Sequence, residues 1–315
     1  LAAQIQGLMN FRKNSHVSGI LLNDCSEKLY KMLKALLERE TGLPVLGYLP
    51  HLPQAAVESR HLGLKTADEI ADLQEKIALL ADALVLDWQR LAVLTEKPAP
   101  EALPGAAAPT SVRIAVAKDE AFCFTYAETL DALRDAGAEL VLFSPVQDAV
   151  LPENIGGLYL PGGYPELYAA QLAENRTLRG QLREAVHAGM PCIAECGGFM
   201  YLTQSIAGHA MAGVLSGSCF DAGKLTRFGY ATLTAQRDSM LFAAGEQIPA
   251  HEFHRWDAEN PGEDFLAEKP SGRSWRCAYA GETLYAGYPH FHFYANLSAA
   301  VRFVEACRKE KHRYE

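Results

Sequence analysis

The sequence predicts two α/β domains, each built around a parallel sheet that is covered by helices. Strand-like and helix-like apolar patterns alternate on both sides of a proline-rich segment at residues 95–111. The chain has 315 residues, enough for two domains of roughly 100–200 residues each. Apolar residues make up 49% and charged residues 21% of the chain, which excludes a disordered polymer and a membrane-embedded protein.

The first domain, predicted over residues 1–96, contains a β-α-β unit. Two short apolar runs, typical of buried strands, flank a stretch in which leucines recur at helical spacing. Gly42 and Pro44 stop the helix before the second strand. Such units build parallel sheets, whose ligands gather at the carboxyl ends of the strands. The predicted elements are a strand at 17–24, a helix at 27–40, a strand at 44–49 and a helical segment at 66–94.

A linker over residues 97–111 and a second domain over residues 112–315 are expected to follow. The segment from 95 to 111 holds four prolines among small residues and is too stiff and polar to join a core. After Gly213 the pattern loosens into short strands and glycine-rich turns. The predicted elements are strands at 112–117, 139–143, 157–160 and 191–195, and helices at about 125–136, 174–188 and 296–310.

Charge and cysteine content restrict location and partners. The chain has 29 basic and 38 acidic residues, a net charge of -9, and no Lys/Arg tract dense enough to attract a nucleic-acid backbone. No apolar stretch approaches the ~20 residues that span a bilayer, and the first residues lack the layout of a signal peptide. The seven cysteines include no CxxC pair. We expect a cytoplasmic protein with neither nucleic-acid nor membrane partners.

The strongest local signal for chemistry is the segment M-P-C-I-A-E-C-G-G-F-M-Y-L at residues 190–202. An apolar strand runs directly into Cys196, two glycines and a helical pattern, which is the outline of a nucleophile elbow. Gly197 and Gly198 leave room around the side chain, and the first helical amides would point toward the sulfur and a developing oxyanion. The alternative is that Cys196 is a small buried hydrophobic residue, as most free cysteines are. The glycine context favours the nucleophile.

A thiol nucleophile needs a base, and A-G-Y-P-H-F-H-F-Y-A-N at residues 286–296 offers His290 and His292. Positions two apart on a strand share a face, so both imidazoles would point toward one cleft. One histidine would accept the thiol proton and later protonate the leaving amine. Structural histidines and a metal site are the alternatives, although no Cys or carboxylate partner supports a metal.

Two further segments carry candidate binding groups. Glycines after a strand in G-G-L-Y-L-P-G-G-Y-P-E, residues 156–166, let the backbone approach a ligand. Gly162 or Gly163 could therefore complete an oxyanion hole that begins at Gly197. The cluster P-A-H-E-F-H-R-W-D at 249–257 is either a polar strand edge or a wall for a substrate that carries carboxylates. Its candidate substrate-binding residues are His251, Glu252, His254 and Arg255, with Arg227 as a second cation.

Together, L-P-G-G-Y-P-E, I-A-E-C-G-G-F-M-Y-L, H-E-F-H and G-Y-x-H-x-H-F resemble the cobyrinate a,c-diamide synthase family in order and spacing across residues 110–310. G-I-L-L-N, P-V-L-G-Y-L-P and R-H-L-G-L (60–64) are similar to the last third of that family's ATP-binding domain. The resemblance covers nearly the whole chain. It implies an incomplete P-loop-type parallel-sheet domain followed by a class I glutamine amidotransferase-like, flavodoxin-like α/β domain.

The resemblance also implies a ligase that uses glutamine as its amide donor. The domain at 112–315 would hydrolyse glutamine through a thioester on Cys196, with His290 as base and Gly163 and Gly197 as oxyanion donors. Ammonia would pass to the other domain, where ATP and Mg²⁺ activate the a and then the c acetate carboxylate of cobyrinate, a step in making cobalamin. Residues 1–96 would be the carboxyl-terminal part of the ATP-binding domain.

One feature departs from related triad amidotransferases and is shared with the resembled family, and a larger one departs from that family's own pattern. Related triad amidotransferases carry a Glu two residues after the base, where this chain has His292, so His290 has no assigned partner. The phosphate-binding loop GxxxxGK[ST] is missing, because the nearest string, D-A-G-K-L-T at 221–226, has Leu225 after the lysine and Ser218 in place of the first glycine. We expect the sequence to be truncated at its amino terminus, with the ATP site mostly outside it.

The sequence leaves alternatives for which substrate is amidated and for whether the glutaminase-like domain is catalytic. The same amidation could act on hydrogenobyrinate or nickel sirohydrochlorin, since their acetate side chains are similar. A glutaminase-like domain could also serve as a non-catalytic binding scaffold. The sequence leaves a homodimer open.

Overall fold

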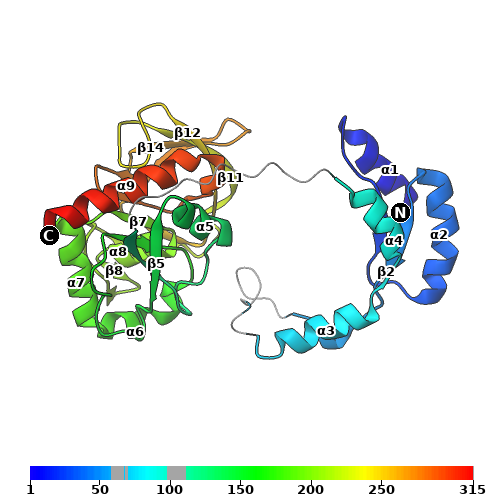
Figure 1. Cartoon of the computed structure of the whole chain (residues 1–315), viewed down its shortest axis with the longest axis horizontal. Helices are drawn as coiled ribbons and strands as arrows, with labels where there is room; N and C mark the ends of the chain where they lie inside the picture. Colours follow the sequence, from blue (N-terminus) through cyan, green and yellow to red (C-terminus); the bar gives the residue numbers. More distant parts are fainter. Residues whose placement is uncertain (58–66, 68–69, 98–110, 315) are drawn as a thin grey trace. The chain divides into compact units, whose positions relative to one another are not determined.

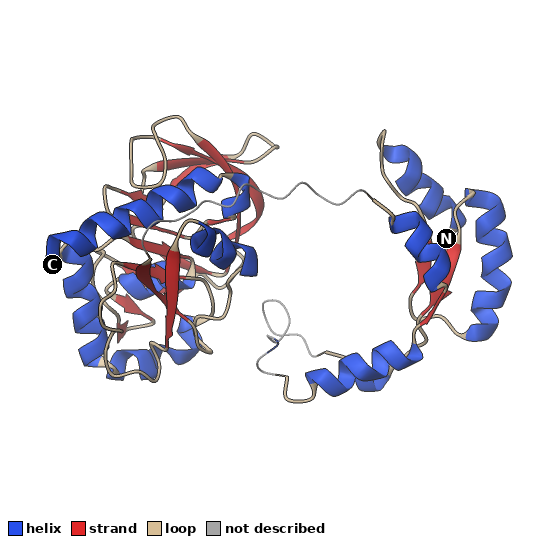
Figure 2. Ribbon diagram, viewed as in Figure 1, coloured by secondary structure: helices blue, strands red, loops and turns tan. Residues whose placement is uncertain are grey.

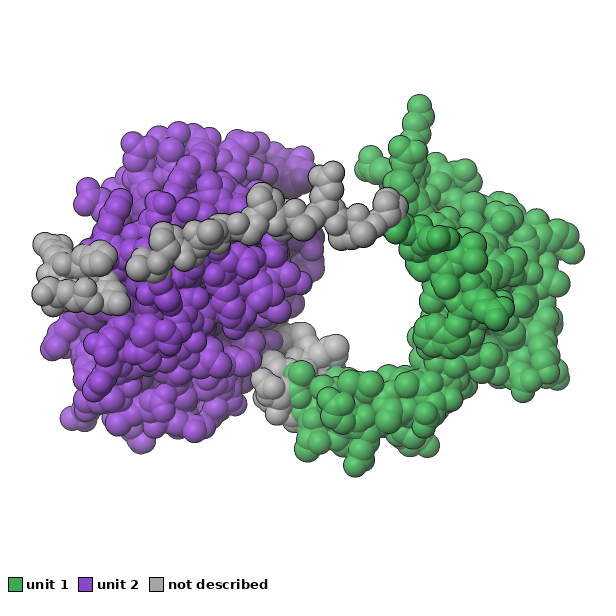
Figure 3. Space-filling view, viewed as in Figure 1, with its two compact units in different colours: residues 1–102 green, residues 103–315 purple. Residues whose placement is uncertain are grey.

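The computed structural model describes residues 1–57, 67, 70–97 and 111–314, with side chains described up to residue 310. The chain divides into two compact units, Leu1–Ala102 and Leu103–Glu315 (Figure 3). The R-H-L-G-L segment at 60–64 and most of the expected linker lie outside the described residues. Across the described part of the chain, every helix is too short or too polar to cross a membrane.

The first unit contains the predicted β-α-β arrangement. Strands β1 (Ile20–Leu22) and β2 (Val45–Tyr48) are parallel neighbours, and helix α2 (Glu27–Thr41) connects them. The helix begins at Ser26, whose side chain accepts a hydrogen bond from the backbone of Leu29, and it ends at Gly42 with φ 71°. The unit's core is small, and its buried residues are Ile5, Ile20, Leu22, Cys25, Leu37 and Val45.

The helical pattern predicted over 66–94 is wrong in part, because a strand interrupts it. Strand β3 (Val85–Leu86) pairs antiparallel with β2 and completes a three-stranded sheet. The carboxylate of Asp87 caps the next helix by accepting from the backbone N–H of Arg90, so a new helix starts there. The other elements of this unit are α1 (Ala2–Phe11), η1 (Pro53–Ala55), α3 (Leu73–Ala83) and α4 (Trp88–Thr95).

The second unit is built on a six-stranded sheet in the order β16-β17-β7-β6-β4-β5. Strands β5 and β7 of this sheet are labelled in Figure 1, and strands are drawn in red in Figure 2. Its strands are parallel except β16, which confirms the predicted α/β class. The strands are β4 (Val112–Ala117), β5 (Ala138–Phe143), β6 (Gly157–Leu160), β7 (Cys192–Glu195), β16 (Tyr279–Ala280) and β17 (Leu284–Gly287).

Helices and a second sheet cover both faces of this sheet. Alternate residues of β4 enter different cores, because Ile114 and Val116 join one buried cluster while Ala115 and Ala117 join the other. The first cluster includes residues of α5 and α9, and the second includes residues of α7 and α8. The helical elements are α5 (Ala127–Asp135), η3 (Pro165–Tyr168), α6 (Ala169–Glu174), α7 (Arg176–His187), α8 (Gly197–Leu202), η4 (Phe293–Ala295) and α9 (Leu297–Tyr314).

The loosened pattern after Gly213 folds into antiparallel strands. A five-stranded sheet has the order β15-β14-β11-β12-β18, and a small four-stranded sheet has the order β13-β10-β8-β9. The bounds are β8 (Ser205–Ile206), β9 (His209–Ala210), β10 (Ser218–Asp221), β11 (Arg227–Ala235), β12 (Gln247–His254), β13 (Trp256–Ala258), β14 (Phe265–Glu268), β15 (Ser274–Cys277) and β18 (His290–Phe291).

Candidate active site

Cys196 lies at the tight turn between strand β7 and helix α8. Its backbone has φ 48° and ψ -102°, a conformation that costs a non-glycine residue about 1–3 kcal/mol. The turn is held by hydrogen bonds, since the Cys196 N–H donates to the carbonyl of Gly287 at 2.8 Å and the Cys196 carbonyl accepts from Met200 at 2.9 Å. The side chain is 8% exposed. This is the strained strand-to-helix geometry of a nucleophile elbow.

Three glycines allow the backbone to close around this cysteine. A Cβ atom on Gly198 would lie 2.0 Å from the Leu160 carbonyl oxygen, and one on Gly163 would lie 2.1 Å from the Ala121 carbonyl oxygen. A Cβ on Gly197 would lie 3.0 Å from the backbone nitrogen of Gly163. The amides of Gly163 and Gly197, predicted as a pair of oxyanion donors, therefore lie close together beside Cys196.

His290 is buried on β18 and faces the cysteine. Its ring interacts with the sulfur of Cys196, and its buried Nδ1, which has no hydrogen-bond partner within the described residues, lies 3.7 Å from Oε2 of Glu195. Gly162 lies against the same ring, because a Cβ there would be 2.5 Å from Cε1 of His290. The structure thus brings Cys196 and His290 together from segments far apart in the sequence.

The electrostatics of the pair favour a protonated imidazole. Burial by itself would lower the pKa of His290. The sulfur of Cys196 and the carboxylate of Glu195 act in the opposite direction and raise this pKa to about 10. A ring that holds its proton stabilises a neighbouring thiolate, which is the reactive form of cysteine.

Glu195 is the site residue that the sequence analysis missed. The residue is 2% exposed, and its carboxylate accepts hydrogen bonds from the hydroxyl of Tyr159 at 3.0 Å and from the backbone N–H of Phe291 at 3.4 Å. A signal for it existed, because a carboxylate inside an apolar strand is almost never buried without a partner. That partner, His290, comes from a distant strand.

His292 does not lie on a strand beside His290 as the two-residue alternation predicted. Strand β18 ends at Phe291, and His292 precedes the short helix η4, where its Nδ1 accepts the N–H of Tyr294 at 3.3 Å. Its Nε2 lies 3.8 Å from Glu128. The alternation failed because the chain turns immediately after two strand residues.

The polar cluster on β12 is divided by the strand's alternation. His251 pairs in register with His290 on β18, and the two rings stack with their centroids 5.1 Å apart. The hydroxyl of Tyr126 lies 3.3 Å from Nδ1 of His251. Burial, followed by the neighbouring His290, lowers the pKa of His251. His251 therefore contacts the candidate base.

Glu252 and His254 point to the opposite face of β12. Oε2 of Glu252 lies 3.0 Å from Nε2 of His254, and its Oε1 accepts from the indole N–H of Trp275 at 3.1 Å. The guanidinium of Arg227 lies over the Trp275 ring, 5.1 Å from its centroid. These residues line a cavity of about 130 Å³ together with Asp257 and Tyr288.

Arg255 does not line this cavity. It faces Asp221 in a two-point ion pair, with its Nε and terminal nitrogen 2.8 and 3.2 Å from the carboxylate oxygens. In the described part of the chain, no three His, Cys, Asp or Glu side chains gather in a way that could hold a metal ion.

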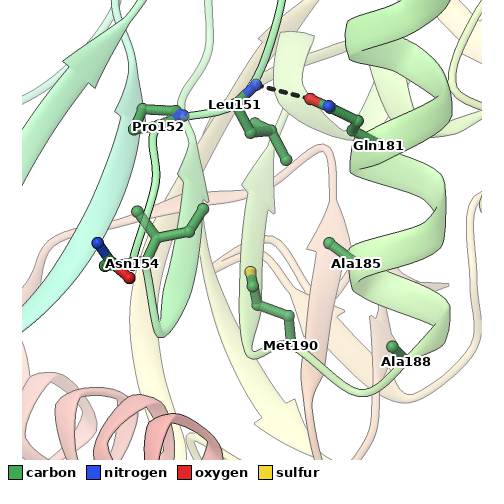
Figure 4. A pocket seen from close by; sticks show the side chains of 8 residues that line it. Leu151, Pro152, Asn154, Gln181, Ala185, Ala188 and Met190 are labelled. Carbon is green, nitrogen blue, oxygen red and sulfur yellow. Dashed lines mark hydrogen bonds between the residues drawn. The ribbon is translucent and has the colours of Figure 1, made fainter. Parts of the chain in front are cut away.

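A larger hollow lies at the end of the parallel sheet where strands β6 and β7 begin, opposite the end that carries Cys196 (Figure 4). It has a volume of about 390 Å³ and is lined by residues that precede β6 and β7, such as Ile155 and Met190, and by α7. The backbone N–H of Leu151 donates to Oε1 of Gln181 at 2.8 Å beside it. Because Cys196 follows β7, this hollow is not part of the candidate active site.

Comparisons with known proteins identify similar chains. Residues 113–297 match the family model of the CobB/CobQ-like glutamine amidotransferase domain. The cobyrinate a,c-diamide synthase of Caldanaerobacter subterraneus subsp. tengcongensis is 35% identical over 98% of this chain and 71% of its own length. The cobyrinate a,c-diamide synthase of Clostridium acetobutylicum is 36% identical over 96% of this chain and 71% of its own length.

Solved structures show a weaker likeness. PurLQS from Thermotoga maritima is 14% identical, with a TM-score of 0.41 over 64% of this chain and 98% of its own. A glutamine amidotransferase from Methylobacillus flagellatus is 14% identical, with a TM-score of 0.33 over 65% of this chain and 92% of its own.

Proposed function

Because the chain belongs to the cobyrinate a,c-diamide synthase family, we propose that it serves the glutamine-dependent amidation of the a and c acetate carboxylates of cobyrinate. The chain is thus a carbon–nitrogen ligase of cobalamin biosynthesis with a glutamine amidotransferase domain. The observation that carries the glutaminase half is the contact between Cys196 at its strained turn and buried His290.

Cys196 is the proposed nucleophile and His290 the proposed base. The thiolate attacks the side-chain amide carbon of glutamine and forms a C–S bond, and the carbonyl π electrons move to the oxygen. The N–H groups of Gly163 and Gly197 are the proposed donors to that oxyanion, and one such donor lowers the barrier by about 3–4 kcal/mol. The imidazolium of His290 then protonates the amide nitrogen, the C–N bond breaks, and ammonia leaves a thioester on Cys196.

Hydrolysis of the thioester returns the site to its starting state. His290, now neutral, takes a proton from water as the water oxygen attacks the thioester carbon. The C–S bond breaks, glutamate leaves, and the Cys196 thiolate and His290 imidazolium are restored. The released ammonia is the proposed nitrogen source for the amidation of the second substrate.

Polar side chains on strands β11 and β12, and Arg255 directly after β12, are the proposed contacts for substrate. Arg227, Glu252 and His254 share one cavity that combines a cation with carboxylates, which suits a small dipolar or acidic ligand. His251 is proposed to act at His290 instead, because the two rings stack. Arg255 is proposed to attract acidic substrate at the surface. A carboxylate of the substrate would replace Asp221 as the partner of its guanidinium.

ATP and Mg²⁺ would activate the carboxylate in this family's reaction, and residues 1–96 are proposed to belong to the domain that binds them. The described residues of this segment do not fit these groups, because they contain neither a GxxxxGK[ST] loop nor a cluster of carboxylates for a metal. We therefore assign no step to ATP or Mg²⁺ here. We place the reaction in the cytoplasm.

The glutaminase half is tested by measuring glutamate released from glutamine by the whole chain and by its Cys196→Ser variant. We expect release by the wild type and loss of more than about a hundredfold in the variant, since an alcohol at this site lacks the thiol's acidity. Equal activity of the two proteins would contradict the nucleophile.

The substrate is tested separately with cobyrinate and hydrogenobyrinate, each supplied with glutamine, ATP and Mg²⁺. Chromatography of the products should show amides of cobyrinate. Amides of hydrogenobyrinate alone would contradict the proposed substrate while leaving the glutaminase assignment in place.

A further inference from the structure

We propose that Glu195 is a positioning residue of the glutaminase site, which orients the ring of His290 toward Cys196 through Nδ1. The inference rests on the proposed roles of Cys196 and His290. It supplies the acidic partner that is missing two residues after the base, where the chain has His292.

The contacts of Glu195 fit this role on both of its oxygens. Oε2 lies 3.7 Å from Nδ1 of His290, and Oε1 accepts the backbone N–H of Phe291, the residue next to the base, at 3.4 Å. The same carboxylate therefore faces the buried Nδ1 of His290, for which the described residues provide no hydrogen-bond partner, and binds the strand that carries this ring. Catalytic contacts are often long without substrate and shorten when it binds.

Tyr159 keeps the carboxylate in place. Its hydroxyl donates to Oε2 of Glu195 at 3.0 Å. Burial, followed by the charge of Glu195, raises the pKa of Tyr159 well above its usual range, so the hydroxyl keeps its proton and remains a donor. A buried carboxylate that accepts such bonds needs a cation to balance its charge, and the imidazolium of His290 supplies it.

Neighbouring side chains are engaged elsewhere. His292 turns toward Glu128 and Tyr294, and Glu252 is bound to His254 and Trp275. His251 contacts the face of the His290 ring and cannot accept from Nδ1. Among the residues that the structure describes, no other carboxylate oxygen lies within 4.0 Å of His290.

The proposed role of Glu195 is to fix the positions of the protons on the ring of His290. When the thiol proton moves to His290, Nδ1–H points at Glu195 and the second nitrogen carries the proton that will reach the leaving amine. The carboxylate thus fixes the tautomer of the neutral ring and stabilises the charged ring. No proton passes to Glu195.

Glu195→Gln tests the proposal, because the amide retains the size of the carboxylate while removing its charge, and its single carbonyl oxygen can still accept from either Tyr159 or Phe291. We expect kcat for glutamine hydrolysis at neutral pH to fall about tenfold to a hundredfold, with KM changed less than about threefold. The alkaline limb of the kcat/KM profile should move to lower pH, because loss of the negative charge lowers the pKa of His290. A profile and a kcat equal to those of the wild type would overturn the proposal.

Alkylation of Cys196 by iodoacetamide provides a readout that needs no glutamine turnover. In Glu195→Gln the rate at neutral pH should fall, since a less basic His290 leaves less thiolate. Failure of the wild type to hydrolyse glutamine would contradict the proposed function, whereas unchanged alkylation across pH in the variant would contradict the role of Glu195 alone.

His292→Asn is the matched control, because asparagine can still accept the N–H of Tyr294. Its kcat and pH profile should match those of the wild type, and a loss as large as that of Glu195→Gln would assign the partner to His292. Tyr159→Phe serves if Glu195→Gln does not fold, as judged by circular dichroism. It should produce a smaller shift in the same direction, and the absence of any shift would count against the proposal.

Discussion

Gly162→Ala is expected to disable the site through one added methyl group. Gly162 is not among the glycines with positive φ, so alanine can adopt its backbone conformation. The new Cβ would lie 2.5 Å from Cε1 and 3.2 Å from Nε2 of His290. Ordinary carbon contacts are about 3.5–4.0 Å, so the ring or the loop must move by about 1 Å.

The expected losses of activity and stability follow from this displacement of about 1 Å. A misplacement of about 1 Å at a catalytic group can cost about a hundredfold in rate, and overpacking of a tight core costs about 1–3 kcal/mol of stability. We therefore expect kcat for glutamate release to fall about a hundredfold and the free energy of unfolding in urea to fall by about 1–3 kcal/mol.

Gly180→Ala is the control for this change. Gly180 lies in α7 with no atom within 4 Å of its added Cβ, so alanine should leave the activity unchanged and stabilise the helix by about 0.5–1 kcal/mol. If Gly162→Ala kept more than a third of the wild-type activity, the close approach of this loop to His290 would be refuted.

Three further predictions concern strain, charge and pH. Cys196→Gly should abolish glutamate release. Its free energy of unfolding in urea should nevertheless exceed that of Cys196→Ala by about 1–3 kcal/mol, because glycine relieves the backbone strain at φ 48°. Equal free energies of unfolding would refute the strain. Glu252→Ala should lower the free energy of unfolding by about 3–5 kcal/mol, since it leaves His254 buried without the carboxylate that it contacts. A loss below about 1 kcal/mol in urea unfolding would argue against a buried pair of Glu252 and His254. The raised pKa of His290 contributes stability that is present below its unfolded pKa of about 6.5 and is lost as pH rises toward about 10. Between these values the free energy of unfolding should fall more in the wild type than in His290→Gln, and parallel curves would contradict the assigned charge.

The sequence was sufficient to predict the turn at Cys196. The apolar strand before Cys196 and the two glycines after it are local features, and each has a direct structural consequence in β7 and α8. The approach of Gly163 to Gly197 could also be expected, because both follow strands whose carboxyl ends meet at one sheet edge.

The arrangement around His290 depends on pairing between distant segments. Glu195 lies beside His290 because β18, which carries His290, pairs with β12 at the edge of the five-stranded sheet. His251 contacts His290 because the two residues are paired in the register of β12 and β18. Local alternation carries no information on either pairing. It also misplaced His292, since it assumed a strand that extends past Phe291.

The most direct test of the central claim is the site and rate of labelling by 6-diazo-5-oxo-L-norleucine, an electrophilic analogue of glutamine, followed by peptide mass spectrometry. The wild type should carry the label on Cys196 and not on Cys123, which is the more exposed thiol. His290→Gln should label about a hundredfold more slowly. Labelling of another cysteine, or an unchanged rate in His290→Gln, would contradict the assignment of Cys196 and His290 as nucleophile and base.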